Sequence, residues 1–170
     1  IDPVRYPAAG LSAADVVGVR RLKARMESER LPRGVDPRRH TKLGPGGLSD
    51  VEWVVQLLQQ EHGAALAPLR TTATVPAMAA AVAAGLIDGE DAEVLLESWR
   101  LASRVRNAIT LVLGKPGDAI PNDVRDVGSV SRVLGYEAGQ SSDMVEDYLR
   151  TTRRARRVFD RLFYGISETG

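Results

Sequence analysis

Apolar side chains recur every three to four residues along most of the 170-residue chain, and no stretch alternates apolar and polar residues long enough to indicate a β-sheet. The pattern predicts a first helix that begins after Ser12, with Asp15 as its capping partner, and that ends near Leu31. Lys23 falls on the apolar stripe of this helix. Five further helices are expected at about 49–62, 76–85, between Asp88 and Gly114, at 124–136 and at 141–164. The predicted fold class is an all-α bundle of about six helices.

Two long segments rich in proline and glycine interrupt the predicted helices, at residues 32–48 and 114–123. The first holds three Pro, four Gly and five basic residues when His40 is counted. A loop of this length inside a compact domain is uncommon unless it is functional or disordered. We therefore expect an irregular lead-in at residues 1–10, a single helical domain at 11–164 and a C-terminal tail at 165–170.

The composition excludes several classes of function. Lys and Arg number 23 against 22 Asp and Glu, so a net charge of +1 gives no general attraction to nucleic acid or to a membrane. The absence of Cys excludes disulfides and thiolate metal sites, and two His, expected at the surface, make a zinc site improbable. The longest apolar run is far too short to span a membrane, and the N-terminus shows neither a signal peptide nor an initiator Met. These features indicate a piece of a cytoplasmic protein, monomeric or weakly associating.

Residues 39–63, "RHTKLGPGGLSDVEWVVQLLQQEHG", carry the most informative pattern, which has a structural and a functional interpretation. In the structural one, Ser49 and Glu52 form a capping box at the start of a helix, and Asp50 favours the helix dipole. In the functional one, a polar strip on an otherwise apolar helix lies beside a basic, glycine-rich loop, which suits phosphate or metal chemistry. The strip is Glu52, Gln56 and Gln59, and the basic residues are Arg38, Arg39, His40 and Lys42.

The block "KLGPGGLSDVEWVVQLLQ" resembles the signature D-x-K-x-x-x-G-G-[IL]-x-D-[IV]-E-[FW]-x-x-Q of glutamine synthetase adenylyltransferases. The same helical domain occurs beside the nucleotidyltransferase core of PII uridylyltransferases. The sequence departs at His40, where the family often has Asp, at Thr41, and at Trp53, where Phe is common. A weaker likeness extends over about residues 11–164. Nine positions match the signature: Lys42, Gly46, Gly47, Leu48, Asp50, Val51, Glu52, Trp53 and Gln56.

The resemblance implies a helical accessory domain of a bifunctional enzyme, in which each of two nucleotidyltransferase domains is followed by such a domain. One half transfers AMP from ATP to a Tyr of glutamine synthetase, and the other removes it by phosphorolysis. ATP and Mg²⁺ are implied for the parent enzyme. The implied partners are the nucleotidyltransferase domain of the same chain, glutamine synthetase and a PII-type signal protein.

The catalytic G-S…D-x-D motif of that superfamily is missing, since "GLSD" (47–50) and "GED" (89–91) are poor substitutes. We therefore expect no catalytic residue, no metal ligand, no bound cofactor and no transferase activity from this chain alone. The ending "RLFYG" favours the C-terminal, adenylylating half of the parent.

The resemblance also suggests which residues form a nucleotide or interdomain site. We expect Lys42 near the ATP phosphates, with Asp50 and Glu52 orienting the loop or the metal-bound site, and a loop that is mobile without its partner domain. The candidate set is Arg39, Lys42, Gly46, Gly47, Asp50, Glu52 and Gln56.

The last predicted helix is strongly basic and has two interpretations. Its arginines could form a solvated face with pairs such as Glu146–Arg150, or Arg153, Arg154 and Arg157 could dock an acidic partner surface. A nucleic-acid module is not favoured, because aromatic residues are not interleaved with the basic ones. Two functions therefore remain open, an accessory domain that forms one wall of a nucleotidyltransferase site, and a regulatory docking module.

Overall fold

The computed structural model describes residues 6–166 and contains no strand in that range, which confirms the all-α prediction. Short 3₁₀-helices η1 (Pro37–Arg39) and η2 (Ala67–Leu69) lie in the connections. The predicted lead-in and tail lie partly outside the described residues. The α-helices are α2 (Ala13–Glu29), α3 (Leu48–His62), α4 (Thr74–Ala83), α5 (Gly89–Leu113), α6 (Val124–Val133) and α7 (Ser141–Phe159), which continues as the π-helical segment η3 (Asp160–Tyr164).

Local signals set most of the helix boundaries. The side chain of Ser12 accepts from the backbone N–H of Asp15, and the carboxylate of Asp15 accepts from the backbone N–H of Ser12. The predicted capping box of α2 is therefore confirmed. Asp88 and Asp123 cap α5 and α6 more simply, because their side chains accept from backbone N–H groups of the first helical turn. Gly114 follows α5 with a φ of 66°, a conformation that suits glycine.

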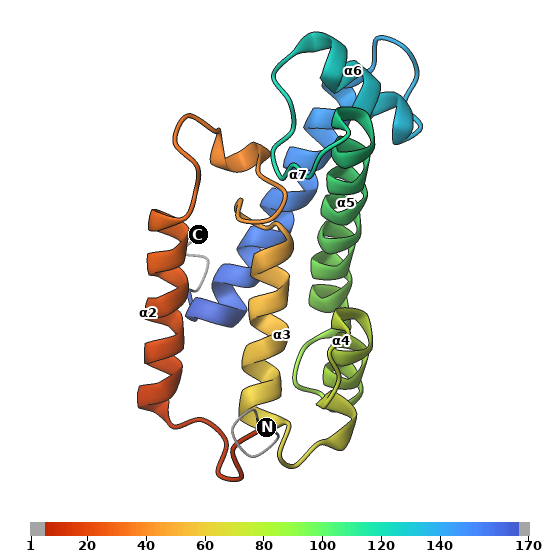
Figure 1. Cartoon of the computed structure of the whole chain (residues 1–170). Coiled ribbons are helices and arrows are strands. Elements are labelled where there is room, and N and C mark those ends of the chain that lie inside the picture. Colours follow the sequence, from red (N-terminus) through yellow and green to blue (C-terminus); the bar gives the residue numbers. More distant parts are fainter. Residues whose placement is uncertain (1–5, 167–170) are drawn as a thin grey trace.

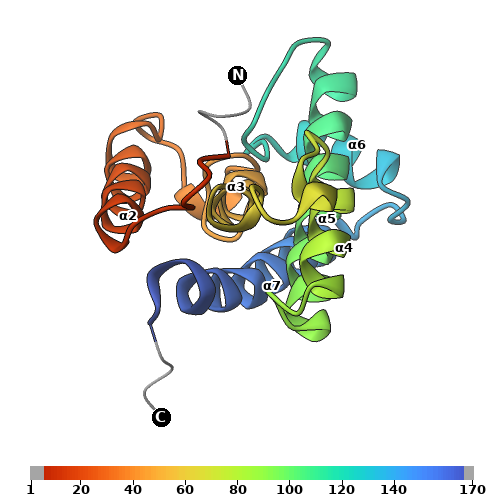
Figure 2. The same ribbon diagram turned by 90° about the horizontal axis from the view of Figure 1, so that it is seen from below.

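Helix α3 lies in the middle of the bundle (Figures 1 and 2). It packs against α4, α5 and α7, while α6 covers one end of the α5–α7 pair. Helix α2 stands on the opposite side of α3 from α4 and α5. This arrangement places the segment before α3 beside α7, which is far away in the sequence.

Two clusters of buried apolar side chains form the core. One joins α3 and α4 to the end of α7, where the rings of Phe159 and Phe163 stack with centroids 4.9 Å apart. The other joins α5, α6 and the first half of α7 around Val105 and Tyr148. Trp99 is half-buried and packs against both clusters, and Trp53 packs against the first.

The start of α3 differs from the prediction. The helix begins at Leu48 with Gly47 as its N-cap, so the predicted capping box of Ser49 and Glu52 is wrong. The N–H groups of Leu48 and Ser49 instead donate to the carbonyl oxygens of Thr41 and Lys42, at 3.0 and 2.9 Å. Backbone carbonyls of the preceding turn thus replace a side-chain cap, and Ser49 is buried inside the helix.

In the described part of the chain, none of the helices combines the length and the apolar character that crossing a bilayer requires.

Candidate functional site

Residues 40–48, here called the glycine turn, are held tightly by the backbone. Gly44 donates to the carbonyl of His40 and Gly47 to that of Gly44, both at 2.9 Å. The N–H and the hydroxyl of Thr41 both donate to the carbonyl oxygen of Asp118, so the turn is also tied to the segment after α5. These bonds satisfy backbone groups that would otherwise be buried without partners.

The glycines are required because other backbone segments approach the turn closely. Gly46 has a φ of 71°, and a Cβ there would overlap the carbonyl oxygen of Thr152 on α7. A Cβ on Gly47 would meet the carbonyl oxygen of Thr41. The hydroxyl of Ser98 on α5 donates to the carbonyl of Gly46 at 2.7 Å, and Ser98 is fully buried. The turn therefore packs against two helices, which contradicts the expectation of a mobile loop for this part of residues 32–48.

Asp50 is 1% exposed and is the centre of a buried charge cluster. One carboxylate oxygen accepts from the Lys23 ammonium at 2.6 Å. The other accepts from the N–H of Gly46 at 2.7 Å and from the Arg156 guanidinium at 3.0 Å. Asp50 therefore joins α2, the glycine turn and α7 to the first turn of α3. We define the charge cluster as Lys23, Glu27, Asp50, Arg156 and Asp160.

The two cations of the cluster and its three carboxylates favour each other's charged forms. Burial opposes the ionisation of Glu27, but the hydrogen bond from Arg156 and the charges of Lys23 and Arg156 outweigh it and hold the pKa of Glu27 below its ordinary value. Burial also disfavours the charged form of Arg156, yet its hydrogen bond to Glu27 and the charges of Asp50, Glu27 and Asp160 raise its pKa. The Arg156 guanidinium lies 4.8 Å from the centre of the Phe159 ring, which adds a cation–π contact.

A Mg²⁺ ion does not fit this cluster. Both oxygens of Asp50 already accept from cationic or N–H donors, and a metal would have to displace Lys23 or Arg156. Over residues 6–166, no group of three or more His, Cys, Asp or Glu side chains is arranged to hold a metal ion. The role of Asp50 that the geometry supports is therefore orientation of the loop, one of the two roles expected for it.

Lys42 and Gln56 are exposed and Glu52 is half-buried, whereas Asp50 is buried. Glu52 and Gln56 line a polar hollow of about 130 Å³ against residues 71–74, and Lys42 lies outside it. Gln59, the third residue of the predicted strip, is buried and donates to the carbonyls of Leu69 and Thr71, both at 2.7 Å. The predicted strip therefore has two parts, of which only the first is available to a partner.

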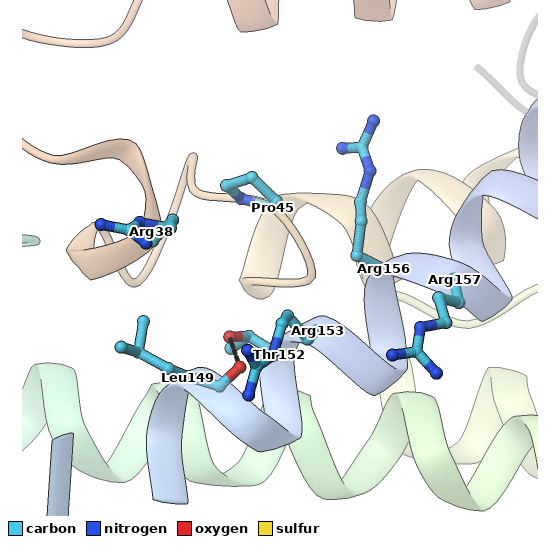
Figure 3. Close-up of a pocket in the computed structure, with 7 residues that line it drawn as sticks. All are labelled: Arg38, Pro45, Leu149, Thr152, Arg153, Arg156 and Arg157. Atoms are coloured by element: carbon cyan, nitrogen blue, oxygen red, sulfur yellow. Dashed lines mark hydrogen bonds between the residues drawn. The ribbon is translucent and has the colours of Figure 1, made fainter. Parts of the chain in front are cut away.

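A second hollow, of about 270 Å³, lies between α7 and the segment before α3 (Figure 3). Arg153 and Arg157, two of the predicted docking residues, line it, whereas Arg154 lies outside it and faces Glu97 at 3.6 Å. Nothing in the sequence indicates that the loop and the basic helix meet here. The lining residues are Arg38, Pro45, Leu149, Thr152, Arg153, Arg156 and Arg157.

Arg39, His40 and Arg150 take positions that the sequence did not indicate. Arg39 donates to the carbonyl of Pro121 at 2.6 Å. His40 is 4% exposed and accepts from the N–H of Leu43, so its expected surface position is wrong. Burial lowers the pKa of His40 below its ordinary value of 6.5. Arg150 pairs with Asp147 rather than with the expected Glu146.

Of the five members of the charge cluster, the sequence identified only Asp50; Lys23, Glu27, Arg156 and Asp160 were missed. Lys23 carried a usable signal, because a cation on the apolar stripe of a helix must find a buried partner. Arg156 carried none, since it is one of several arginines on α7 and reaches Asp50 from 106 residues away.

Comparison of the sequence with known proteins identifies the family to which the chain belongs. The sequence model of the GlnD PII-uridylyltransferase family matches residues 20–163. Three similar proteins, each named bifunctional glutamine synthetase adenylyltransferase/adenylyl-removing enzyme, come from Streptomyces avermitilis, Streptomyces coelicolor and Mycolicibacterium smegmatis. They are 62%, 59% and 46% identical over 97%, 96% and 96% of this chain. The chain spans 16% of the length of each.

Proposed function

The chain belongs to the GlnD PII-uridylyltransferase family, and we propose that it is the helical accessory domain of a bifunctional glutamine synthetase adenylyltransferase/adenylyl-removing enzyme. In that role it forms one wall of a nucleotidyltransferase site and contributes to the control of glutamine synthetase by AMP transfer from ATP to a Tyr. The similar proteins carry that name, and the chain covers about one sixth of their length, which leaves room for catalytic domains elsewhere. A cytoplasmic location belongs to the same proposal.

One observation carries the proposal, the exposure of Lys42 on a turn that is otherwise fixed. His40 and Thr41 before it and Gly44 after it are buried, while the Lys42 side chain is exposed. The carbonyl of Lys42 accepts from Ser49, so its backbone is fixed to α3. A flexible cation on a fixed backbone is suited to reach an anionic group that a neighbouring domain holds.

The chemistry divides between the domains. In the proposed role, carboxylates of the nucleotidyltransferase domain hold the metal ion. Lys42 would approach the phosphates of ATP at the interdomain surface and offset their negative charge. Glu52 and Gln56 would supply hydrogen-bonding groups to the same neighbouring domain from their polar hollow.

The test is made in the full-length parent enzyme with Lys42→Ala and Glu52→Gln. AMP transfer to glutamine synthetase and thermal stability are measured for each variant. Lys115→Ala, at another exposed lysine in a connecting segment, is the matched control. The proposal requires a loss of AMP transfer by Lys42→Ala at unchanged stability, and normal transfer by the control. If all variants transfer AMP as well as the unsubstituted enzyme does, the glycine turn has a purely structural role.

A second candidate function, a docking module, is favoured by the arginine-lined hollow beside α7. Arg153 and Arg157 make no ion pair with any residue of the described range, so their charges are available to a partner. Glutamine synthetase or a PII-type signal protein would be that partner in the parent enzyme. The two functions use different surfaces and are compatible in one domain.

A further inference from the structure

One stripe of α7 borders two hollows on the surface of the domain. The two hollows share Leu149 and Arg153 as lining residues. The second hollow has a volume of about 490 Å³ and reaches to the start of α7. Together they form one groove, here called the α7 groove, which follows residues four apart: Ser141, Val145, Leu149, Arg153 and Arg157.

The α7 groove has an apolar floor and a basic rim. Val127, Val145, Leu149 and Pro45 provide apolar surface in the two hollows. Five arginines line the two hollows, of which Arg156 belongs to the charge cluster, and Glu146 is the single acidic residue that lines them. The arginines at the rim are Arg38, Arg39, Arg153 and Arg157.

The charge of this rim is only partly compensated. Asp36 pairs with Arg38, and Arg39 donates to a neutral carbonyl. Arg153 and Arg157 have no acidic partner among residues 6–166. The rim therefore attracts carboxylates from outside the domain.

The spread of the guanidinium groups indicates the kind of ligand. In Figure 3, the side chains of Arg38, Arg156 and Arg157 point in different directions and do not converge on one point. A single phosphate is best held by convergent donors, whereas spaced carboxylates suit donors that are spread along a groove. The stripe from Ser141 to Arg157 covers about 24 Å of helix axis. An extended segment of about seven residues spans that distance.

We propose that the α7 groove binds an acidic polypeptide segment with apolar side chains, supplied by a partner protein. Its carboxylates pair with Arg153, Arg157 and the other arginines of the rim, and its apolar side chains cover Leu149 and Val145. The inference rests on the docking function proposed above and not on the role of Lys42. A second copy of this chain is a poor occupant, because 23 basic against 22 acidic residues leave it no surplus of acid.

The experiment uses this 170-residue chain and a fluorescein-labelled peptide, EEDLELEE, whose two Leu share one face of an extended segment, followed by fluorescence anisotropy at low and high NaCl. We expect saturable binding that weakens with salt, because the contacts are ionic. A peptide with both Leu replaced by Gly should bind more weakly, because it cannot cover the floor. The double variant Arg153→Glu/Arg157→Glu should weaken binding by about tenfold or more. The variant Arg100→Glu/Arg104→Glu, with the same spacing and charge change on α5, should change it less than about twofold.

Several outcomes overturn the proposal. They are no binding, equal losses in both double variants, equal binding of the glycine peptide, and displacement by sodium tripolyphosphate at concentrations below those of unlabelled peptide. A dimer that is seen in sedimentation and that the Arg153→Glu/Arg157→Glu variant abolishes would instead assign the α7 groove to a second copy of this chain. Circular dichroism of each variant separates misfolding from lost binding. Lys42→Ala should leave peptide binding unchanged, so failure here and failure of the interdomain role are distinguishable.

Discussion

Replacing Asp50 by Asn should strongly destabilise the domain, because it breaks a buried charge cluster without changing the size of the side chain. Asp50 accepts three hydrogen bonds, from Lys23, from the Gly46 N–H and from Arg156. An Asn side chain has one carbonyl oxygen and one NH₂ group. In one orientation the NH₂ group faces the Lys23 ammonium, and in the other it faces two donors. Either orientation places donor against donor.

The size of the effect follows from burial. Lys23 is 2% exposed, so the loss of its main partner leaves a cation with little access to water. Breaking a buried ion pair by removing one partner costs about 3–5 kcal/mol. Glu27, 3.2 Å from the Lys23 ammonium, offsets part of the loss, which favours the lower end of that range. Domains of this kind have about 5–15 kcal/mol of total stability, so the variant should still fold.

Urea denaturation followed by circular dichroism measures the change. Glu97→Gln is the control, because it removes an ion pair with Arg154 in which both side chains are about half exposed. That change should cost about 0–1 kcal/mol. Lys23→Met, alone and combined with Asp50→Asn, completes a double-mutant cycle, in which the two losses should be strongly non-additive. A cost below about 1 kcal/mol for Asp50→Asn, or additive losses, would refute the reasoning.

Three further predictions concern the glycine turn. Gly46→Ala should cost more than about 3 kcal/mol in urea denaturation, because its Cβ overlaps the Thr152 carbonyl and φ is positive. Ser98→Ala should cost about 1–3 kcal/mol by leaving the Gly46 carbonyl without its donor, whereas Ser49→Ala should cost less than about 0.5 kcal/mol, because Ser49 is no cap. The His40 pKa is lowered by burial, so the unfolded chain binds the proton more readily, and stability present above pH 6.5 should fall as the pH drops through the folded-state pKa. His40→Asn should flatten this part of the stability–pH curve.

The helices could be predicted because their signals are local. The capping box of Ser12 and Asp15, the caps at Asp88 and Asp123, and the apolar spacing all act within a few residues. The start of α3 could not be predicted in the same way. Ser49 and Glu52 have the spacing of a capping box. In the structure, however, the N–H groups of Leu48 and Ser49 donate to the carbonyl oxygens of Thr41 and Lys42, and the helix begins before Ser49.

The sequence drew attention to part of the candidate site but did not reveal how its residues are arranged. The signature identified Gly46, Gly47 and Asp50 as important, and all three have structural roles in the glycine turn. What they contact could not be read from the sequence, because Lys23 and Arg156 are 27 and 106 residues away from Asp50. An acid in the first turn of a helix is equally compatible with the helix dipole and with a buried ion pair, and only the packing of α2 and α7 decides between them.

The structure divides the signature into two sets of residues that should respond differently to substitution. Gly46 and Asp50 are buried and hold the glycine turn against α7, so their loss should lower stability and activity together. Lys42 is exposed and Glu52 is half-buried beside a polar hollow, so an activity loss at unchanged stability at these positions can be assigned to contacts with another domain. A loss of AMP transfer in an Asp50 variant is therefore no evidence for a role in chemistry. The comparison that identifies an interdomain contact is Lys42→Ala against Lys115→Ala at equal stability.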